Sequence, residues 1–432
     1  MPAVVIVGGQ WGDEGKGRIV DLAAAKAHIV ARYSAGNNAG HTIVNELGKF
    51  SLHLVPAGIF YPDKLCLIGN GLVIDPAVLL GEIADLESRG VAVHGRLFVS
   101  DRAHVIMPWH PKLDALDEGL RGRAAIGTTG RGVTPAFVDK VGRRGIRMAD
   151  LIDGQGLRER LSALLPYKNA MLEKLYDSSP FDERSIYEEY AGYGAELAPF
   201  VADTACLAQE ALSRGECVLL EGAQGALLDL DIGTYEYVTS SVPSSLAAGA
   251  CIGLGIGPTH VSAVVGVYKS YMTRVGNGPM PTELTDEDGD RLREHGPQPE
   301  YGATTGRPRR CGWFDAVASR YTARINGVTA VALTRLDVLD QFATIKVCRA
   351  YSLDGALIDS FPAGLAALTK AEPVYEDLPG WQVDTSGIRR FANLPREARA
   401  YVRRIEEMLG APVKLVSVGP QRDQAIPMGE LF

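Results

Sequence analysis

The sequence predicts an α/β fold in which helices flank a large, mostly parallel central sheet. Short apolar runs such as residues 3–7 and 328–333 recur along the chain, and continuous apolar strands are typical of parallel sheets buried on both faces. Several of these runs end in glycine-rich turns, which predict P-loop-like nucleotide-binding loops at the strand ends. Segments without such runs predict helical and loop insertions.

Length and composition exclude several classes of protein. A chain of 432 residues can form one big domain or two or three smaller ones. Its net charge of −8 gives no indication of the basic surface that binds nucleic acid or an anionic membrane. The start lacks a signal peptide, and no apolar run reaches the ~18 residues of a membrane span. Six cysteines without Cys-x-x-Cys spacing indicate reduced thiols, so we predict a cytoplasmic protein.

The first glycine-rich turn, residues 8–17, lies between an apolar run and a helix-forming segment. This order presents backbone N–H groups and the positive end of a helix to phosphate oxygens. The turn is not a Walker A loop, because Gln10 replaces the first glycine and Gly17 replaces the Ser or Thr that should follow Lys16. Taken alone, such a loop is more often a tight turn than a ligand site.

Two carboxylates, Asp13 and Glu14, distinguish this loop from a simple anion pocket. A carboxylate beside phosphates indicates a metal ion, a general base or both. A second strand-like run, residues 28–33, ends in the turn 34–42, which contains His41. We interpret strand, helix and strand as a βαβ unit with two adjacent strands. Its two loops would then lie side by side, and His41 would form an acid–base pair with Asp13.

The next segments continue the alternation of helices, strands and turns. Residues 76–89 begin with Pro and keep helical spacing, and Gly90 predicts the stop. Residues 126–132 and 139–147 are glycine-rich and basic, which suits the phosphate of a nucleotide monophosphate. Residues 151–215 favour helices that cover the sheet.

The last third of the chain predicts further strand ends with polar turns. Residues 217–221 predict a buried strand, and Gln224 after it has the donor and the acceptor that suit a purine edge or ribose. Near the C-terminus, residues 395–409 predict a helix and residues 412–416 a strand, which ends in the turn 417–420.

An acidic segment followed by an arginine-rich one predicts a substrate lid. Residues 285–299 have no apolar period and read as an exposed loop. In residues 303–310, three arginines beside two threonines form a trap for a small dicarboxylate. Pro308 should stiffen this loop. The whole of 285–312 is therefore predicted to be mobile and to close on substrate.

The strand at residues 328–333 ends in a turn that can recognise guanine. Asp337 can accept hydrogen bonds from N1–H and the 2-amino group of guanine, whereas adenine offers no such donor pair. This favours GTP over ATP. Many guanine-binding proteins have Lys where this chain has Arg335, although an Arg can still stack on the base.

Residues 10–17 and 38–42, taken together, closely resemble the adenylosuccinate synthetase family, enzymes that join L-aspartate to IMP with GTP. The resemblance runs from about residue 3 to about residue 423. It implies a single α/β domain over 1–432, with the helical insertion at 151–215. It also implies Mg²⁺, one ion per subunit, and a homodimer in which Arg143 reaches the neighbouring subunit's IMP site. The implied products are adenylosuccinate, GDP and phosphate, in the first committed step of AMP synthesis.

The resemblance also assigns site residues. It implies catalytic roles for Asp13 and His41, and metal ligation by Asp13 and Gly40. It implies GTP contacts from Gly12, Asp13, Glu14, Gly15, Lys16, Gly17, Arg18, Gly40, His41, Thr42, Arg309, Arg335, Leu336, Asp337, Ser417, Val418 and Gly419. It implies IMP contacts from Asp13, Asn38, Ala39, Gly40, His41, Thr129, Arg143, Gln224, Thr239 and Arg307. It implies aspartate contacts from Ala303, Thr304, Thr305, Gly306, Arg307, Pro308 and Arg309.

The implied chemistry gives the acid–base pair distinct tasks. The 6-oxygen of IMP is a poor leaving group, and phosphorylation by GTP converts it into a good one, as 6-phosphoryl-IMP. Asp13 is the candidate base for the N1 proton, and a protonated His41 would hydrogen-bond the oxygen or the phosphoryl group. Lys16, the loop N–H groups and Mg²⁺ would neutralise the triphosphate. The amine of aspartate then displaces phosphate.

Two departures from the family and two alternatives remain. Thr134 stands where many relatives have Gly, and residues 242–250 differ from the usual continuation, so no contacts are transferred there. A non-catalytic GTP-binding or switch-type protein would keep Lys16 and Asp337, but it would have no need of the acid–base pair and the arginine loop. A related ligase could use ATP or another purine acceptor; a dGMP-specific relative is expected to lack Asp13.

Overall fold

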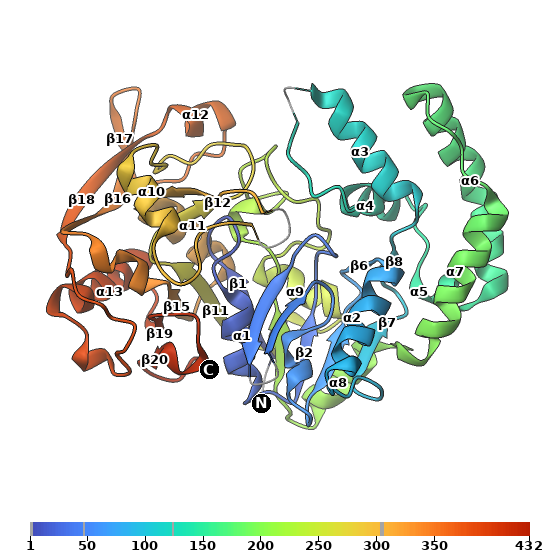
Figure 1. Cartoon of the computed structure of the whole chain (residues 1–432), viewed down its shortest axis with the longest axis horizontal. Helices are drawn as coiled ribbons and strands as arrows, with labels where there is room; N and C mark the ends of the chain where they lie inside the picture. The colour runs from blue at the N-terminus through green and yellow to red at the C-terminus, as the bar shows by residue number, and fades with distance from the viewer. Residues whose placement is uncertain (1–2, 46–47, 123–124, 303–305) are drawn as a thin grey trace.

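A ten-stranded sheet runs through the middle of the described chain (Figure 1). The structure is a computed structural model and describes residues 3–45, 48–122, 125–302 and 306–432. Neighbouring strands are parallel, except that β20 lies antiparallel to β19 at one edge. In spatial order the strands are β20 (Ala425–Pro427), β19 (Val413–Ser417), β15 (Ala330–Thr334), β11 (Val261–Lys269), β1 (Ala3–Gly8), β10 (Val218–Glu221), β2 (Ile29–Arg32), β5 (Leu65–Ile68), β7 (Leu97–Ser100) and β9 (Val201–Ala202).

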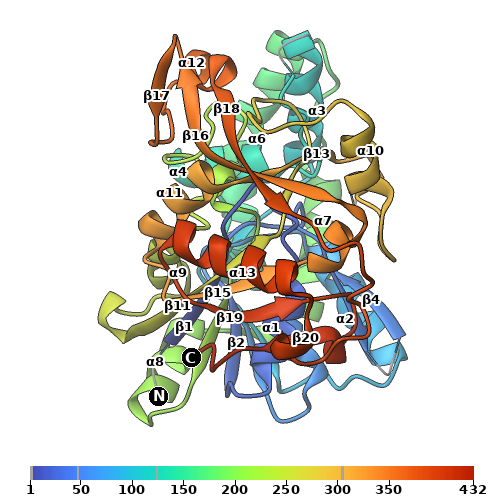
Figure 2. The ribbon, with the colours of Figure 1, turned by 90° about the vertical axis from the view of Figure 1, so that its left-hand side faces the viewer.

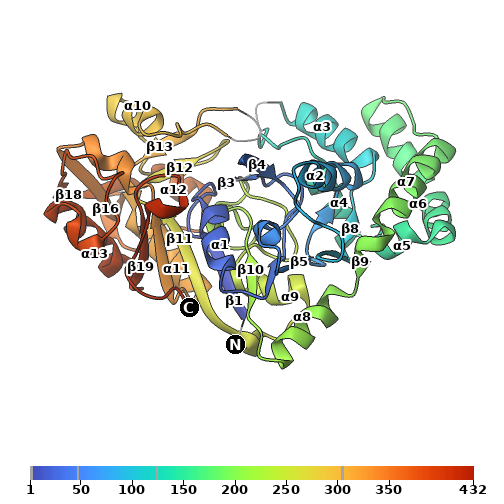
Figure 3. The same ribbon diagram turned by 60° about the horizontal axis from the view of Figure 1, so that its bottom comes forward.

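Helices cover the sheet and extend the molecule at both of its ends (Figure 3). Helices α3 to α7 form one end, and α13 lies with β16 and β18 at the other. The helices are α1 (Lys16–Ala24), α2 (Pro76–Ser88), α3 (Trp109–Arg121), α4 (Val133–Val141), α5 (Met148–Ile152), α6 (Gly154–Tyr176), α7 (Glu183–Leu197), α8 (Thr204–Ser213), α9 (Ala247–Leu254), α10 (Glu287–Glu294), α11 (Ala316–Asn326), α12 (Leu365–Lys370) and α13 (Arg396–Leu409).

Shorter strands build loops and a small C-terminal sheet, which stands above α13 in Figure 2. The pairs are β3 (His41–Asn45) with β4 (Gly48–Leu52), β6 (Val73–Ile74) with β8 (His104–Val105), and β12 (Met272–Arg274) with β13 (Arg310–Gly312). The small sheet contains β14 (Phe314–Asp315), β16 (Thr344–Leu353), β17 (Ala356–Ile358) and β18 (Glu372–Pro379).

Both faces of the central strand β1 are buried. Val4 and Ile6 belong to one apolar cluster, together with Ile19 of α1. Val5 and Val7 belong to a second cluster, which includes residues of α8 and α9. Since side chains alternate between the faces of a strand, burial on both sides makes the sequence of β1 continuously apolar. This explains why the run predicted a parallel sheet.

Helices α3, α4 and α6 are held together by a buried ionic group, the Asp139 cluster, which consists of Asp139, His110 and Lys168. Their side chains are at most 4% exposed. Asp139 of α4 lies 2.8 Å from Nε2 of His110 in α3 and 2.5 Å from Nζ of Lys168 in α6. His110 Nδ1 accepts a hydrogen bond from the backbone N–H of Met107, so Nε2 carries the proton donated to Asp139. One carboxylate therefore joins three helices.

Most of the predicted elements are confirmed. The runs at residues 3–7, 28–33, 217–221, 328–333 and 412–416 are β1, β2, β10, β15 and β19, and residues 151–215 are mainly helical. Helix α13 confirms the prediction for 395–409. Helix α2 begins at Pro76 after the N-cap Asp75, and Gly90 beyond its end has a φ of +81°. Among the described residues, no helix has both the length and the apolar character needed to cross a bilayer.

Two local predictions are wrong. Strands β1 and β2 are not neighbours, because β10 inserts between them and pairs with both. The exposed loop predicted at 285–299 contains helix α10, which Asp286 caps by accepting a hydrogen bond from the N–H of Gly289. Acidic residues in the first turn and arginines in the last turn of α10 favour its dipole, and Leu292 anchors it in the core.

Candidate active site

A cavity of about 750 Å³ opens at the carboxyl ends of five neighbouring strands, β15, β11, β1, β10 and β2. The last residues of four of these strands line it: Thr334, Lys269, Glu221 and Arg32. The fifth strand, β1, contributes the glycine-rich loop that follows it. Ligands of open parallel sheets bind at this edge, because the carboxyl ends of all the strands meet there.

The loop after β1 depends on glycines for its close packing. A Cβ on Gly8 would lie 2.4 Å from Glu14 Oε2, and a Cβ on Gly9 would lie 1.9 Å from the ring of Tyr268. Gly12 has a φ of +88°, a conformation that disfavours other residues. The loop can therefore run close to the ends of β10 and β11, which brings its backbone N–H groups into the cavity.

The two carboxylates of this loop have different environments. Glu14 is fully buried, and its Oε1 accepts hydrogen bonds from the N–H groups of Gln10 (3.0 Å) and Gly12 (2.9 Å). Its Oε2 lies 2.6 Å from Nζ of Lys16. By contrast, the side chain of Asp13 is 37% exposed and lines the cavity. Glu14 therefore shapes the loop, and Asp13 is the carboxylate that a ligand can reach.

Asp13 is paired with a residue of the predicted substrate loop. Arg309 Nε donates to Asp13 Oδ2 at 2.6 Å, and Arg309 Nη1 donates to Glu300 Oε2 at 2.6 Å. Glu300 is 1% exposed and also accepts from Lys269 (2.9 Å) and Arg335 (3.1 Å). We call Glu300, Lys269, Arg309 and Arg335 the Glu300 cluster. Burial raises the pKa of Glu300, but the three cations outweigh it and hold this pKa well below its ordinary value.

His41 lies against the start of α1, where a Cβ on Gly17 would approach its Cβ to 3.0 Å. His41 Nδ1 is 3.5 Å from Glu221 Oε1, and its Nε2 is buried without a hydrogen-bond partner among the described residues. Burial, and next the charge of Arg32, lower the pKa of His41 to about 3. The imidazole is therefore neutral at pH 7, and the predicted protonated form requires added negative charge nearby.

Helix α1 also joins the loop to the C-terminal turn. The guanidinium group of Arg18 donates to Ser417 Oγ and to the carbonyl oxygen of Gly419. Arg422 makes a bidentate pair with Asp21 of α1, with both distances 2.6 Å. Burial lowers the pKa of Arg18 to about 10, which leaves it charged at pH 7. Residues about 400 positions apart thus form one wall of the cavity.

The predicted guanine-binding turn forms the short helix η6 (Leu336–Gln341), directly after Arg335. Asp337 is 6% exposed, and its Oδ1 has no hydrogen-bond partner among the described residues. Burial raises the pKa of Asp337. A buried acceptor without a donor is costly, and guanine would supply the missing N–H groups. Arg335 binds Glu300 and the hydroxyl group of Tyr271, so its guanidinium group is held in the Glu300 cluster.

Gln224 and its neighbours form the opposite side of the cavity. Gln224 Oε1 accepts hydrogen bonds from the hydroxyl groups of Ser245 (3.1 Å) and Ser241 (3.4 Å). Thr239 Oγ1 lies 3.2 Å from Ser241 Oγ. Since the acceptor of Gln224 is occupied, its amide nitrogen is the group left for a ligand. The atypical segment 242–250 therefore supports the site through Ser245.

The loop at residues 126–132 meets the arginine loop at the cavity. Glu118 accepts hydrogen bonds from the backbone N–H groups of residues 126–128, at 2.9 to 3.4 Å. Thr129 is exposed and lines the cavity. Arg307 Nη2 lies 3.5 Å from the carbonyl oxygen of Thr128. The loop predicted to bind the IMP phosphate thus contacts Arg307 of the predicted aspartate trap.

The structure collects most of the predicted site residues. Those that line the cavity are Gly12, Asp13, Glu14, Gly15, Lys16, Gly17, Arg18, Asn38, Ala39, Gly40, His41, Thr129, Gln224, Thr239, Arg309, Arg335, Ser417 and Gly419. Those that are described but not part of its lining are Arg143, Gly306, Arg307, Pro308, Leu336, Asp337 and Val418. Those that lie outside the described residues are Ala303, Thr304, Thr305 and the side chain of Thr42.

Sequence reasoning missed several charged residues of the site. Glu300, Lys269, Glu221 and Arg274 are each at most 3% exposed and line the cavity. Three of them end strands, where a charged residue closes an apolar run. That position was the available signal, because charges are rarely fully buried unless they are paired.

The donor atoms suit Mg²⁺ only in combination with phosphates. Among the described residues there is no group of three or more His, Cys, Asp or Glu side chains that could hold a metal by itself. The Asp13 carboxylate and the Gly40 carbonyl are hard oxygen donors at the cavity. Mg²⁺ is commonly bound by one or two carboxylates together with substrate phosphates, so this donor set fits. Arg309 contacts Asp13 through Oδ2, so the carboxylate has a second oxygen for a metal ion.

Comparisons with known proteins agree with this geometry. The family model "Adenylosuccinate synthetase" matches residues 5–426. The adenylosuccinate synthetase of Heliobacterium modesticaldum is 53% identical over 432 residues, covering 100% of both chains. The fully ligated enzyme from Plasmodium falciparum is 38% identical with a TM-score of 0.92, covering 99% of this chain and 100% of that one. A cyanophage S-2L succinoaminodeoxyadenylate synthetase, 22% identical with a TM-score of 0.62, covers 100% of this chain and 96% of its own and shares the fold.

These matches extend over the whole chain and include the loops that form the cavity. Members of the matched family join IMP and L-aspartate with GTP as co-substrate and use Mg²⁺. The alternative of a non-catalytic switch protein receives no support. The chain therefore belongs to the adenylosuccinate synthetase family of GTP-dependent ligases in purine nucleotide biosynthesis.

Proposed function

We propose that this chain ligates L-aspartate to IMP in the cavity described above, with Asp13 as the general base and His41 as the partner of the transferred phosphoryl group. The observations that carry the proposal are that Asp13, His41 and Lys16 line one cavity, that Asp13 is accessible to a ligand, and that the buried Nε2 of His41 has no hydrogen-bond partner among the described residues. A protein that only bound GTP would have no use for this pair.

The first step is the transfer of a phosphoryl group from GTP to the 6-oxygen of IMP. Asp13 takes the N1 proton, which makes the 6-oxygen nucleophilic. Arg309 Nε lies 2.6 Å from Asp13 Oδ2 and so positions this carboxylate at the cavity. Lys16 and the loop N–H groups neutralise the triphosphate. Bound Mg²⁺, held by Asp13 and Gly40, would add further neutralisation of phosphate charge.

His41 would be converted to a donor by the substrates themselves. Its pKa of about 3 in the buried site keeps it neutral, but the phosphates of GTP and IMP add negative charge beside it. Nearby negative charge raises the pKa of an imidazole. His41 Nε2 can then donate a hydrogen bond to the 6-oxygen or the phosphoryl group as charge develops there. In the second step the amine of aspartate displaces phosphate from the 6-carbon.

The remaining residues give specificity. Asp337 would accept the N1–H and 2-amino hydrogens of guanine, which satisfies its unpartnered Oδ1. Arg307 and Arg309 would bind the carboxylates of aspartate by their planar guanidinium groups, within the loop 303–309. Gln224, Thr239, Thr129 and Asn38 would contact IMP.

Three further proposals concern the whole protein. Arg143 is exposed at the turn after α4 and outside the cavity of its own chain, which supports a role in a neighbouring subunit's site within a homodimer. We propose one domain over 1–432, since the same sheet carries strands from residue 3 to residue 427. We also propose that the protein is cytoplasmic, on the basis of its unpaired cysteines.

An ultraviolet absorbance assay with IMP, GTP, Mg²⁺ and L-aspartate tests the function. The wild type should form adenylosuccinate and GDP together. Asp13→Asn and His41→Asn should each lose about 10²- to 10⁴-fold in turnover while still binding IMP, because they remove proton transfer and not the IMP pocket. GDP formation without adenylosuccinate would refute the ligase, and near-normal turnover of either variant would refute its assigned role.

A further inference from the structure

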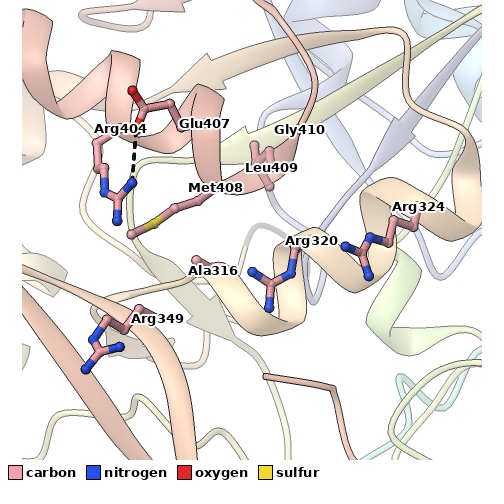
Figure 4. A pocket seen from close by; sticks show the side chains of 9 residues that line it. All are labelled: Ala316, Arg320, Arg324, Arg349, Arg404, Glu407, Met408, Leu409 and Gly410. Atoms are coloured by element: carbon pink, nitrogen blue, oxygen red, sulfur yellow. Dashed lines mark hydrogen bonds and ion pairs between the residues drawn. The ribbon is translucent and has the colours of Figure 1, made fainter. Parts of the chain in front are cut away.

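A second hollow, of about 480 Å³, lies on the C-terminal side of the molecule (Figure 4). It is bounded by α11, α13 and β16 and shares no lining residue with the active-site cavity. Its lining consists of Ala316, Arg320, Arg324, Arg349, Arg404, Glu407, Met408, Leu409 and Gly410. Four of these nine residues are arginines and one is acidic, so we call it the arginine hollow.

The four arginines come from three elements that are distant in sequence. Arg320 and Arg324 are four residues apart on α11 and therefore lie on the same face of the helix. Arg404 belongs to α13. Arg349 sits at the register shift between Cys348 and Ala350, where β16 departs from regular pairing with β18. Such bulges re-aim side chains, and this one adds a cation to the hollow. Figure 4 shows Arg320, Arg349 and Arg404 around one open space.

Neighbouring acidic residues compensate only part of this positive charge. Arg404 pairs with Glu376 at 2.7 Å and with Glu407 at 2.9 Å. Arg320 donates to the carbonyl oxygen of Asp359 at 2.6 Å and lies 3.8 Å from the Asp359 carboxylate, which is a third acidic neighbour. In the described part of the chain, Arg324 and Arg349 have no ion-pair or hydrogen-bond partner for their guanidinium groups. Two guanidinium forks are thus available beside two that are already anchored.

The floor of the hollow is apolar. Ala316, Met408 and Leu409 are at most 8% exposed, and the arginines stand around them. Apolar side chains beside the arginines lower the local dielectric constant, which strengthens the attraction to an anion bound there. The chain as a whole carries a net charge of −8, so this local excess of positive charge is not part of a generally basic surface. Arg324 and Arg349 are themselves exposed, so an anion in solution can reach their guanidinium groups.

We propose that the arginine hollow binds a small, multiply charged phosphorylated anion, with Arg324 and Arg349 as its principal donors and Arg320 as a third. Guanidinium groups bind phosphate oxygens in bidentate fashion, and several converging groups match an anion with many oxygens. A volume of about 480 Å³ lies within the range of small-molecule sites. A nucleic acid or a membrane would need an extended basic surface, which a confined hollow does not offer.

Isothermal titration calorimetry with inorganic pyrophosphate tests this proposal. The protein is first saturated with GDP and IMP in the absence of metal, so that the phosphate positions of the active site are filled. The test variant is Arg324→Ala/Arg349→Ala. The matched control is Arg399→Ala/Arg403→Ala, which removes two positive charges from α13 outside the hollow. A parallel titration with citrate separates phosphate from carboxylate recognition.

We expect one pyrophosphate to bind per chain, with affinity reduced more than about tenfold in Arg324→Ala/Arg349→Ala and retained in the control. Ligase turnover of the test variant should stay at the wild-type level, which shows that it is folded. Absence of binding to the wild type would overturn the proposal, as would equal loss of affinity in both variants. Binding of citrate in preference to pyrophosphate would overturn the assignment to phosphate.

Discussion

The Glu300 cluster and the Asp139 cluster are two buried ionic groups with similar chemistry and different surroundings. Each has one carboxylate that is at most 2% exposed and is surrounded by basic side chains. Asp139 binds residues of packed helices, all of them buried. Glu300 binds Lys269, Arg309 and Arg335, which line the active-site cavity.

The difference shows how one type of interaction can serve packing or ligand binding. A buried ion pair is weak evidence for stability by itself, because removing charges from water offsets much of their attraction. His110, Asp139 and Lys168 are all buried between α3, α4 and α6. The Asp139 cluster therefore chiefly fixes how these three helices pack. At the active site, the arginines that Glu300 binds line the cavity together with Asp13. Glu300 therefore influences both stability and ligand position.

The largest expected effect is that of Glu300→Gln. The amide keeps the size of the side chain but leaves three cations without their shared anion, which should cost about 3–5 kcal/mol of unfolding free energy. Turnover should also fall, because Arg309 and Arg335 lose their anchor. Urea denaturation and steady-state kinetics check the two effects. Unchanged KM and kcat in folded Glu300→Gln protein would contradict the role in ligand position.

Asp139→Asn should be nearly as destabilising but kinetically silent. Removing this carboxylate charge leaves Lys168 buried and unpaired, which should again cost about 3–5 kcal/mol. Because the cluster lies outside the cavity lining, kcat and KM of the folded protein should match the wild type. The same denaturation and kinetic measurements apply. A loss of turnover equal to that of Glu300→Gln would remove the distinction between the clusters.

Acid should weaken both clusters. Although burial raises the pKa of Glu300 and of Asp139, their basic partners lower both to below the ordinary values of 4.5 and 3.8. A carboxyl group with a depressed folded-state pKa contributes stability above its unfolded pKa and loses it as the pH falls towards the folded value. Unfolding free energy should therefore decrease below about pH 4.5, by up to a few kcal/mol. Urea titrations from pH 7 to pH 3 measure this slope, and it should be shallower in Glu300→Gln. An equal slope in that variant would exclude Glu300 as its source.

The smallest expected effect comes from an ion pair on the surface. Arg184 and Glu188 of α7 are 2.7 Å apart, but their side chains are 85% and 60% exposed. Arg184→Ala should change the unfolding free energy by less than about 0.5 kcal/mol, because water and salt screen the pair. Thermal unfolding at low and high salt checks this. A loss comparable to that of Asp139→Asn would show that burial is not what separates these pairs.

Several parts of the site could be predicted from the sequence. Apolar runs that end in glycine-rich turns located the strand ends, and residue chemistry singled out Asp13, His41 and Lys16, all of which line one cavity. Gly8 and Gly9 explain this success, because close backbone packing permits no Cβ at these positions and so restricts the sequence itself. The family resemblance extended the prediction to residues such as Thr239 and Ser417.

Other features depend on contacts between distant segments. Local periodicity reports whether a segment is buried, but not which strand lies beside it, so the insertion of β10 between β1 and β2 was missed. Helix α10 was also missed, since its cap and charges compensate for a nearly apolar-free sequence. In the Glu300 cluster, Glu300 binds residues that are 9 to 35 positions away from it along the chain. No single motif contains all of them.

The glycine-rich loop after β1 shows which features follow from the sequence and which follow from the tertiary structure. The sequence by itself determined that a glycine-rich loop with two carboxylates and Lys16 follows β1, because these residues are adjacent in the chain, and it predicted phosphate binding there. Only the tertiary structure decided that Glu14 turns inward to bind backbone N–H groups and Lys16, while Asp13 faces the cavity and Arg309. The physical reason is that burial and ion pairing of a side chain depend on what folds against it, and neighbouring residues can differ completely in that respect.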